Sequence, residues 1–400
     1  MTESALVIVI TLVCAAFAST VWKGLSGRES RDTNIRLLAT CCRTFLNLQT
    51  RSAWLALPFV ALLLFVGFAI VRPHRESDVF SSSWSLGAWI TASFVLGTLA
   101  VCAQQQIVGF ANRRLAIGSF ARSRSSSEPI QRAIAVRVSL LPPLLSVAVA
   151  LLIPISTQLV AAHLLITSTL SSDAALLRSP FPILGYAFGV SLASLIFQVQ
   201  TGLLQSGSLL GGRSNTIVEL SRDDSSSPVA VAVAIGRLLS PCATSTSDIF
   251  TSTTLAVCAS FVHGAHFATS NRHALPFGIS AITFPSTVMA FGMVASIVAA
   301  LVVQQAESDC PARAYDRGLL VTVALTTAAV AGASKWLFDT LWLVPFASAS
   351  IGAIGVYALT LLTRRLAATA PTAVLNVDSD AHLGPLCAIR GMAHGCLTTS

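Results

Sequence analysis

Six charged side chains in the middle of this 400-residue chain have the types and spacing that could do chemistry. They are Arg213, Glu219, Asp223, Asp224, Arg237 and Asp248. Carboxylate oxygens bind hard cations such as Mg²⁺, and a guanidinium group can hold a phosphate through two parallel hydrogen bonds without a metal. For Asp223 and Asp224, a solvated turn before Pro228 explains the charges equally well. These side chains are therefore weak candidates for metal or phosphate ligands. Whether they can act together depends on the helices and loops that carry them.

Asp248 differs from the others because it falls within an apolar segment, about 235–262. An ionisable side chain within a membrane span is costly, and by default it marks a functional position. Two interpretations stay open. Asp248 takes part in ion transport, or it forms a structural pair with Arg237 near water.

The composition indicates the class of protein that holds these residues. Hydrophobic residues make up 54% of the chain and charged residues only 10%, whereas globular proteins carry about 25% charged residues. Disorder, coiled coil and nucleic-acid binding through a basic surface are disfavoured. The nine cysteines form no CxxC pair and mostly lie in apolar segments, which favours neither a zinc site nor a disulfide framework. The chain is predicted to be an all-α polytopic membrane protein.

Nine apolar segments approach or exceed the roughly 20 residues that a helix needs to cross a bilayer. They cover about 5–22, 53–71, 84–102, 139–166, 182–204, 235–262, 275–303, 318–338 and 341–363. The sixth is the least apolar, and the first is expected to be an uncleaved span because residues 1–4 carry no positive charge. The pattern predicts one helical bundle over 1–363, with a polar cytoplasmic loop at about 205–234 and a cytoplasmic tail over 364–400.

The distribution of Lys and Arg predicts the orientation, since cytoplasmic loops carry an excess of these residues. Two loops on the same side hold six each: Lys23, Arg28, Arg31, Arg36, Arg43 and Arg51, then Arg113, Arg114, Arg122, Arg124, Arg132 and Arg137. The opposite side holds only Arg72, Arg75, Arg178, Arg272 and Lys335. The N-terminus is predicted to lie outside or in a lumen and the C-terminus in the cytoplasm. Because the excess of Lys and Arg in cytoplasmic loops holds for plasma membranes and endomembranes alike, it does not indicate which membrane contains the protein.

Other patterns carry less information about function. The chain contains no GxxxxGK[ST], GxGxxG, HExxH or GxSxG motif. His263 and His266 have a spacing that metal ligands use, but in an outer loop such histidines more often face water. Gly185 and Gly189 would allow a neighbouring helix to approach closely. Lys335 and Asp339 are spaced for an ion pair at the end of a span.

Three separate segments of the chain carry a resemblance to a known family. The central one reads GYAFGVSLASLIFQVQTGLL (185–204), GSLLGGRSNTIVE (207–219), DDSSSP (223–228) and VAIGRLLSPCATSTSDIFTS (233–252). The others are IRLLATCCRTFLNLQTR (35–51) and GPLCAIRGMAHG (384–395). In order and spacing these segments resemble the membrane-integral pyrophosphatases, the pyrophosphate-energised proton pumps. The resemblance implies a helical bundle that is usually a homodimer, of which this chain is about the N-terminal half.

The resemblance also implies a chemistry. In that family, carboxylates four residues apart hold Mg²⁺ and diphosphate in a cytoplasmic cavity, where a water attacks phosphorus. The corresponding aspartates of the family fall at Leu209, Arg213, Val233, Arg237 and Pro241, and a family lysine falls at Ile217. Glu219, Asp223, Asp224 and Asp248 remain as matches to the pattern. The family's coupling arginine falls at Gln198, and its coupling glutamate at Thr251 or Leu255, so the resemblance leaves Asp248 as the remnant of the family's ion gate.

Two hypotheses follow from this comparison of motifs. The first is a pump of the family that hydrolyses Mg-diphosphate and exports protons; against it stand the five substituted aspartates and the shortness of the chain. The second is a non-catalytic relative, an interaction or regulatory subunit that pairs through its helices with a full-length pump. Mg²⁺ is then implied by the family alone and is not expected at the family site. The expected partners are the bilayer and a second copy or a related pump, with diphosphate doubtful and no nucleic acid.

Overall fold

The computed structural model describes residues 2–25, 33–72, 82–122, 128–167, 180, 183–217, 228–270, 275–305 and 311–369, and its regular elements are all helices. The α-helices of these residues are α1 (Thr2–Leu25), α2 (Thr33–Val66), α3 (Ser83–Arg122), α4 (Glu128–Thr167), α6 (Leu184–Ile217), α7 (Pro228–Ser270), α8 (Leu275–Gln305), α9 (Pro311–Phe338) and α10 (Leu343–Thr369). A π-helical segment, η1 (Gly67–Val71), extends α2, and a 3₁₀ turn, η4 (Asp339–Leu341), separates α9 from α10.

The prediction of an all-α polytopic membrane protein is confirmed. Within the described residues, seven helical segments are long and apolar enough to cross a membrane, and α1 adds a shorter apolar stretch, Ala5–Ala18. The remaining helix, α7, corresponds to the segment that was expected to be least apolar. Each of the nine predicted spans therefore has a helix in the structure.

Two boundaries differ from those that the sequence predicts. Helix α6 continues to Ile217 and α7 begins at Pro228, so most of the loop expected over 205–234 is helical. The chain also divides into two compact units, Met1–Trp342 and Leu343–Ser400, where one bundle over 1–363 was expected. Helix α10 belongs to the second unit and extends six residues beyond 363, and none of its apolar window is buried.

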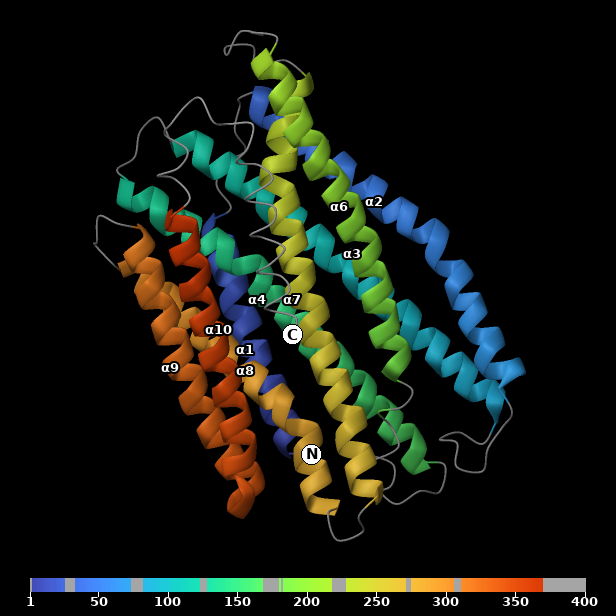
Figure 1. Cartoon of the computed structure of the whole chain (residues 1–400). Coiled ribbons are helices and arrows are strands. Elements are labelled where there is room, and N and C mark those ends of the chain that lie inside the picture. Colours follow the sequence, from blue (N-terminus) through green and yellow to red (C-terminus); the bar gives the residue numbers. More distant parts are fainter. Residues whose placement is uncertain are drawn as a thin grey trace. The chain divides into compact units, whose positions relative to one another are not determined.

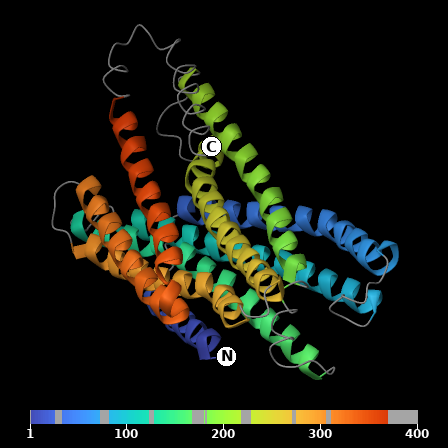
Figure 2. The same cartoon turned by 60° about the horizontal axis from the view of Figure 1, so that its bottom comes forward.

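In the first unit, α6 packs along both α3 and α7 (Figures 1 and 2). Glycines set the closeness of α3 and α6, because a Cβ atom at Gly97, Gly185 or Gly189 would collide with a backbone carbonyl of the facing helix. In a lipid bilayer, no hydrophobic effect drives helices together. Small residues favour association instead, because they let the helix backbones approach closely and pack well. The close approach expected at Gly185 and Gly189 is confirmed, and we refer to these three glycines as the glycine seam.

The end of α9 forms as the sequence predicts. Lys335 Nζ lies 2.8 Å from Asp339 Oδ1, and both side chains are exposed. Asp339 has a φ of 39°, a left-handed conformation that aspartate tolerates better than most residues. The helix therefore ends at this ion pair, and η4 follows directly.

Glutamines are buried between the helices of the first unit. Gln104 in α3 is fully buried, and neither atom of its amide has a hydrogen-bond partner among the described residues. Gln200 in α6 is half-buried and its Oε1 also has no partner among the described residues, but its Nε2 donates to Ser52 Oγ of α2 at 2.5 Å. These two residues offer a matched pair of substitutions.

We expect Gln104→Leu to leave the thermal midpoint in detergent unchanged or to raise it. A buried polar group without a partner costs about 1–3 kcal/mol, and leucine fills a similar volume without that cost. Gln200→Leu should lower the midpoint, since it leaves Ser52 without its donor. A large fall for Gln104→Leu would contradict the expectation and would show that the amide has a partner outside the described residues.

Candidate functional site

Side-chain hydrogen bonds join α6 to α7 at three levels within the part of the two helices whose side chains are described. Thr251 Oγ1 donates to Ser194 Oγ at 2.7 Å, and Gln198 Nε2 donates to Asp248 Oδ1 at 2.5 Å. The hydroxyls of Thr201 and Thr244 lie 3.2 Å apart. On each helix the three positions are separated by three or four residues, so they share one face. We call this set the polar ladder.

The two helices expose different surfaces beside the polar ladder. The exposed residues of α6 are mostly large and apolar, among them Phe188, Leu195, Val199 and Leu203. Helix α7 exposes a row of polar and small residues, flanked by Ile249 and Leu255, which we call the α7 stripe: Ser245, Asp248, Ser252, Ala256, Ala259 and His263. Hydrocarbon satisfies no polar group, so the exposed surface of α6 suits lipid whereas the α7 stripe suits protein or water.

Asp248 is the predicted site residue that the structure describes most fully. Its partner across the helix interface is Gln198, the position where the resemblance places a coupling arginine. Thr251, one of the two positions expected for the coupling glutamate, bonds Ser194 one turn away. The positions expected to form a gate are therefore brought together. The pairing with Arg237 that the sequence left open is not supported, since Arg237 and Asp248 are eleven residues apart on the continuous helix α7, about 16 Å along its axis.

The sequence did not predict two rungs of the polar ladder. Ser194 and Thr201 are buried, each 1% exposed, and their spacing with Gln198 repeats that of Thr244, Asp248 and Thr251. Matching polar periodicity on two consecutive apolar helices is the signal that could have identified them. Glu219, Asp223 and Asp224 lie outside the described residues.

Comparison with known protein families shows to which family the chain belongs. The sequence model of the family described as inorganic H⁺ pyrophosphatase matches residues 8–400. The chain belongs to this family.

Relatives of the pyrophosphatase family agree with that assignment. The chain is 26% identical to pyrophosphate-energized membrane proton pump 3 of Arabidopsis thaliana over 330 residues, 77% of this chain and 39% of that protein. It is 29% identical over 147 residues to K(+)-insensitive pyrophosphate-energized proton pump 2 of Moorella thermoacetica, 36% of this chain and 21% of the pump. The matched region thus spans less than half the length of these curated relatives.

The five residues that the motif resemblance places at the family's metal positions carry no side-chain oxygen with which to bind Mg²⁺. All five lie on helices: Leu209 and Arg213 in α6, and Val233, Arg237 and Pro241 in α7. The helical spacing of four that the resemblance requires is therefore present, but the side chains are apolar, cationic or proline. Mg²⁺ takes oxygen ligands with carboxylates among them, and no group of three His, Cys, Asp or Glu residues suited to a metal occurs in the part of the chain that the structure describes.

The histidines expected in an outer loop lie on a helix instead. His263 and His266 belong to the last turns of α7, which continues to Ser270, and both side chains are exposed. His273 falls outside the described residues. The helix extends further than its apolar segment because the residues after 262 remain compatible with helix. The two histidines supply no metal cluster among the described residues.

Proposed function

We propose that this chain is a pyrophosphatase family member that does not hydrolyse diphosphate by itself. The observation that supports the proposal is the identity of five helical positions, Leu209, Arg213, Val233, Arg237 and Pro241. Hydrolysis of this kind needs metal ions to neutralise charge on the phosphate oxygens and to activate water. Two arginines in place of two aspartates reverse the charge that would attract Mg²⁺. Use of Mg²⁺ is therefore a property of the family and is not proposed for these positions.

The test is magnesium-dependent release of phosphate from diphosphate by the 400-residue chain in membranes that lack their own pump. A proton-gradient dye is read in parallel, and a full-length pump of the family serves as the positive control. We expect both signals to equal those of blank membranes. Restoring all five positions to aspartate should also leave both signals at blank, because the 400 residues match less than half the length of the related pumps. Hydrolysis by the unaltered chain would overturn the proposal.

We propose as a second function that the chain pairs with a full-length pump of the family, as a regulatory or interaction subunit. The α7 stripe favours it, because an exposed row of serine, alanine and aspartate in a membrane helix suits a second helix better than lipid. The same surface would serve a homodimer.

The proposed orientation places the N-terminus outside or in a lumen and the C-terminus in the cytoplasm, as the loop charges favour.

Pairing is tested by co-expressing the chain with tagged Arabidopsis pump 3 and measuring their ratio after tag purification. Ser252→Trp places a bulky side chain on the α7 stripe and should reduce recovery of the chain. Ser191→Trp makes the same change on the exposed surface of α6 and should leave recovery unchanged. Equal recovery of both variants would argue against pairing through α7.

A further inference from the structure

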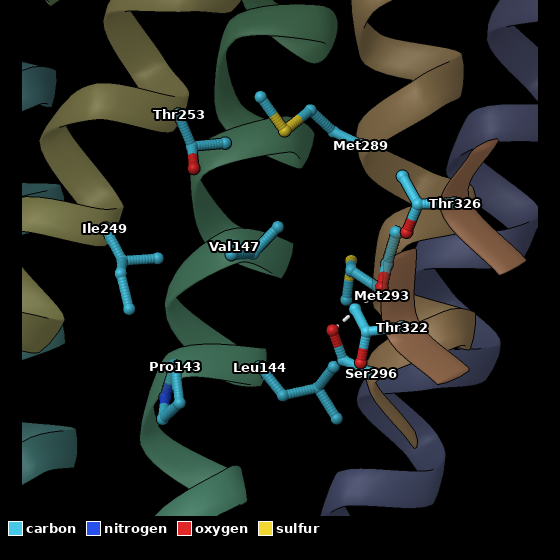
Figure 3. Close-up of a pocket in the computed structure, with 11 residues that line it drawn as sticks. Pro143, Leu144, Val147, Ile249, Thr253, Met289, Met293, Ser296, Thr322 and Thr326 are labelled. Atoms are coloured by element: carbon cyan, nitrogen blue, oxygen red, sulfur yellow. Dashed lines mark hydrogen bonds between the residues drawn. The ribbon is translucent and has the colours of Figure 1, made fainter. Parts of the chain in front are cut away.

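A cavity of about 350 Å³ lies among α4, α7, α8 and α9 in the first unit (Figure 3). Its apolar lining consists of Pro143, Leu144, Val147, Ile249, Met289 and Met293. Methionine side chains are flexible and polarisable, so they adapt to apolar occupants of varied shape. An apolar cavity of less than half this volume, about 150 Å³, can bind a small hydrocarbon such as benzene. The space is therefore large enough for a substantial apolar group.

Two of the four hydroxyl groups in the lining, those of Ser296 and Thr322, are bonded within their own helices, and those of Thr253 and Thr326 complete its polar part. Ser296 Oγ donates to the carbonyl of Gly292 at 2.8 Å, the bond drawn dashed in Figure 3. Thr322 Oγ1 donates in the same way to the carbonyl of Gly318 at 2.9 Å. Each of these donors is thus satisfied by its own helix. A buried water needs two to four polar partners, and cavities without them stay dry.

The cavity lies between apolar segments long enough to cross a membrane, although its lining on α4, Pro143 to Val147, falls near the start of the segment Pro142–His163. Its lining residues on α8, from Met289 to Ser296, fall near the middle of the apolar segment Ser280–Val303. Those on α9, Thr322 and Thr326, fall well inside the apolar segment Asp316–Leu341. The cavity is only partly enclosed. Its open side therefore meets whatever surrounds these segments.

We propose that this cavity binds an acyl chain of a bilayer phospholipid. Three observations converge on that occupant: a mostly apolar lining, two of its four hydroxyls bonded within their own helices, and a position between apolar segments long enough to cross a membrane. Gly292 contributes to the space, because nothing lies within 4 Å of the position its Cβ would take. The site is independent of diphosphate chemistry and holds whether or not the chain hydrolyses or pairs.

The test uses the 400-residue chain in vesicles of phosphatidylcholine that carry a photoreactive diazirine within one acyl chain. After irradiation, mass spectrometry maps the labelled residues. We expect labels on Met289, Met293 and neighbouring lining residues, measured relative to Leu55 and Phe59, which are exposed on α2. Gly292→Leu fills the space and should reduce the relative labelling of the lining at least about fivefold, a loss equivalent to roughly 1 kcal/mol of binding.

The matched control is Gly332→Leu, since Gly332 in α9 also has nothing within 4 Å of its Cβ position and does not line the cavity. It should leave the relative labelling unchanged. Both variants replace glycine inside a helix by a better helix former, and size-exclusion chromatography verifies that each is folded. Absence of label from the lining, unchanged labelling in Gly292→Leu, or preferential labelling of the lining by a water-soluble diazirine would each overturn the proposal.

Discussion

Replacing Gly189 with alanine is expected to destabilise the protein more than any other single methyl addition to α6. The added Cβ would collide with the backbone carbonyl of Phe94, and a backbone atom held in a helix cannot turn aside as a side chain can. The α3–α6 pair must separate along the glycine seam. Overpacking of this kind costs about 3 kcal/mol, which thermal unfolding in detergent and the yield of monodisperse protein would both report.

Gly202→Ala on the same helix is the control for this prediction. Nothing lies within 4 Å of the position of its Cβ, and alanine is the better helix former by about 1 kcal/mol. The thermal midpoint of this variant should stay constant or rise. Equal effects of the two substitutions would show that α3 and α6 do not approach closely at Gly189.

Gln198→Leu is expected to destabilise the protein by about 2 kcal/mol, because it removes the donor that Asp248 has within the polar ladder. Asp248→Leu alone leaves the glutamine amide unpaired and should also cost stability. The double variant replaces both groups with apolar ones and should recover most of the loss. Unfolding in mixed micelles at rising SDS gives the free energies of this double-mutant cycle.

The rung formed by Thr201 and Thr244 provides the comparison for that cycle. Its two partners are neutral hydroxyls 3.2 Å apart, and such bonds between membrane helices contribute about 0.6 kcal/mol on average. Valine at both positions should therefore show a coupling energy well below that of the Gln198 and Asp248 pair. Equal coupling energies in the two cycles would mean that the carboxyl group of Asp248 adds nothing to the interaction.

The sequence predicted the helices better than it predicted their ends. Runs of apolar residues fix a membrane span because hydrocarbon tolerates few other sequences, and every span expected from such a run has its helix. Outside the hydrocarbon core of the membrane, the sequence of a helix is no longer restricted to apolar residues. The extension of α6 to Ile217 and the start of α7 at Pro228 fall outside the predicted apolar runs. The division of the chain at Leu343 falls within the run 341–363, which predicts a helix but not the unit to which that helix belongs.

The candidate site was predictable in part, and for a similar reason. Motif spacing located Asp248 and the facing position Gln198 before the structure joined them. Helix geometry alone argues against Arg237 as the partner of Asp248, because eleven residues on one helix correspond to about 16 Å along its axis. Gln198 was not predictable from spacing, because tertiary packing decides which residue of another helix faces Asp248. Ser194 and Thr201 were missed, since a single hydroxyl in a membrane helix usually bonds its own backbone, as Thr201 also does with Phe197.

The glycine seam bears on how such proteins are recognised in genomes. A position with no room for a methyl group must remain glycine as long as the chain folds, whatever the protein does. An aspartate that binds a metal is retained only while hydrolysis benefits the cell. A lineage that loses the reaction therefore keeps the residues by which its ancestry is detected. If activity is assigned from family membership alone, inactive members will then be counted as pumps. The acidic residues at the motif positions of α6 and α7 should be inspected before an activity is assigned.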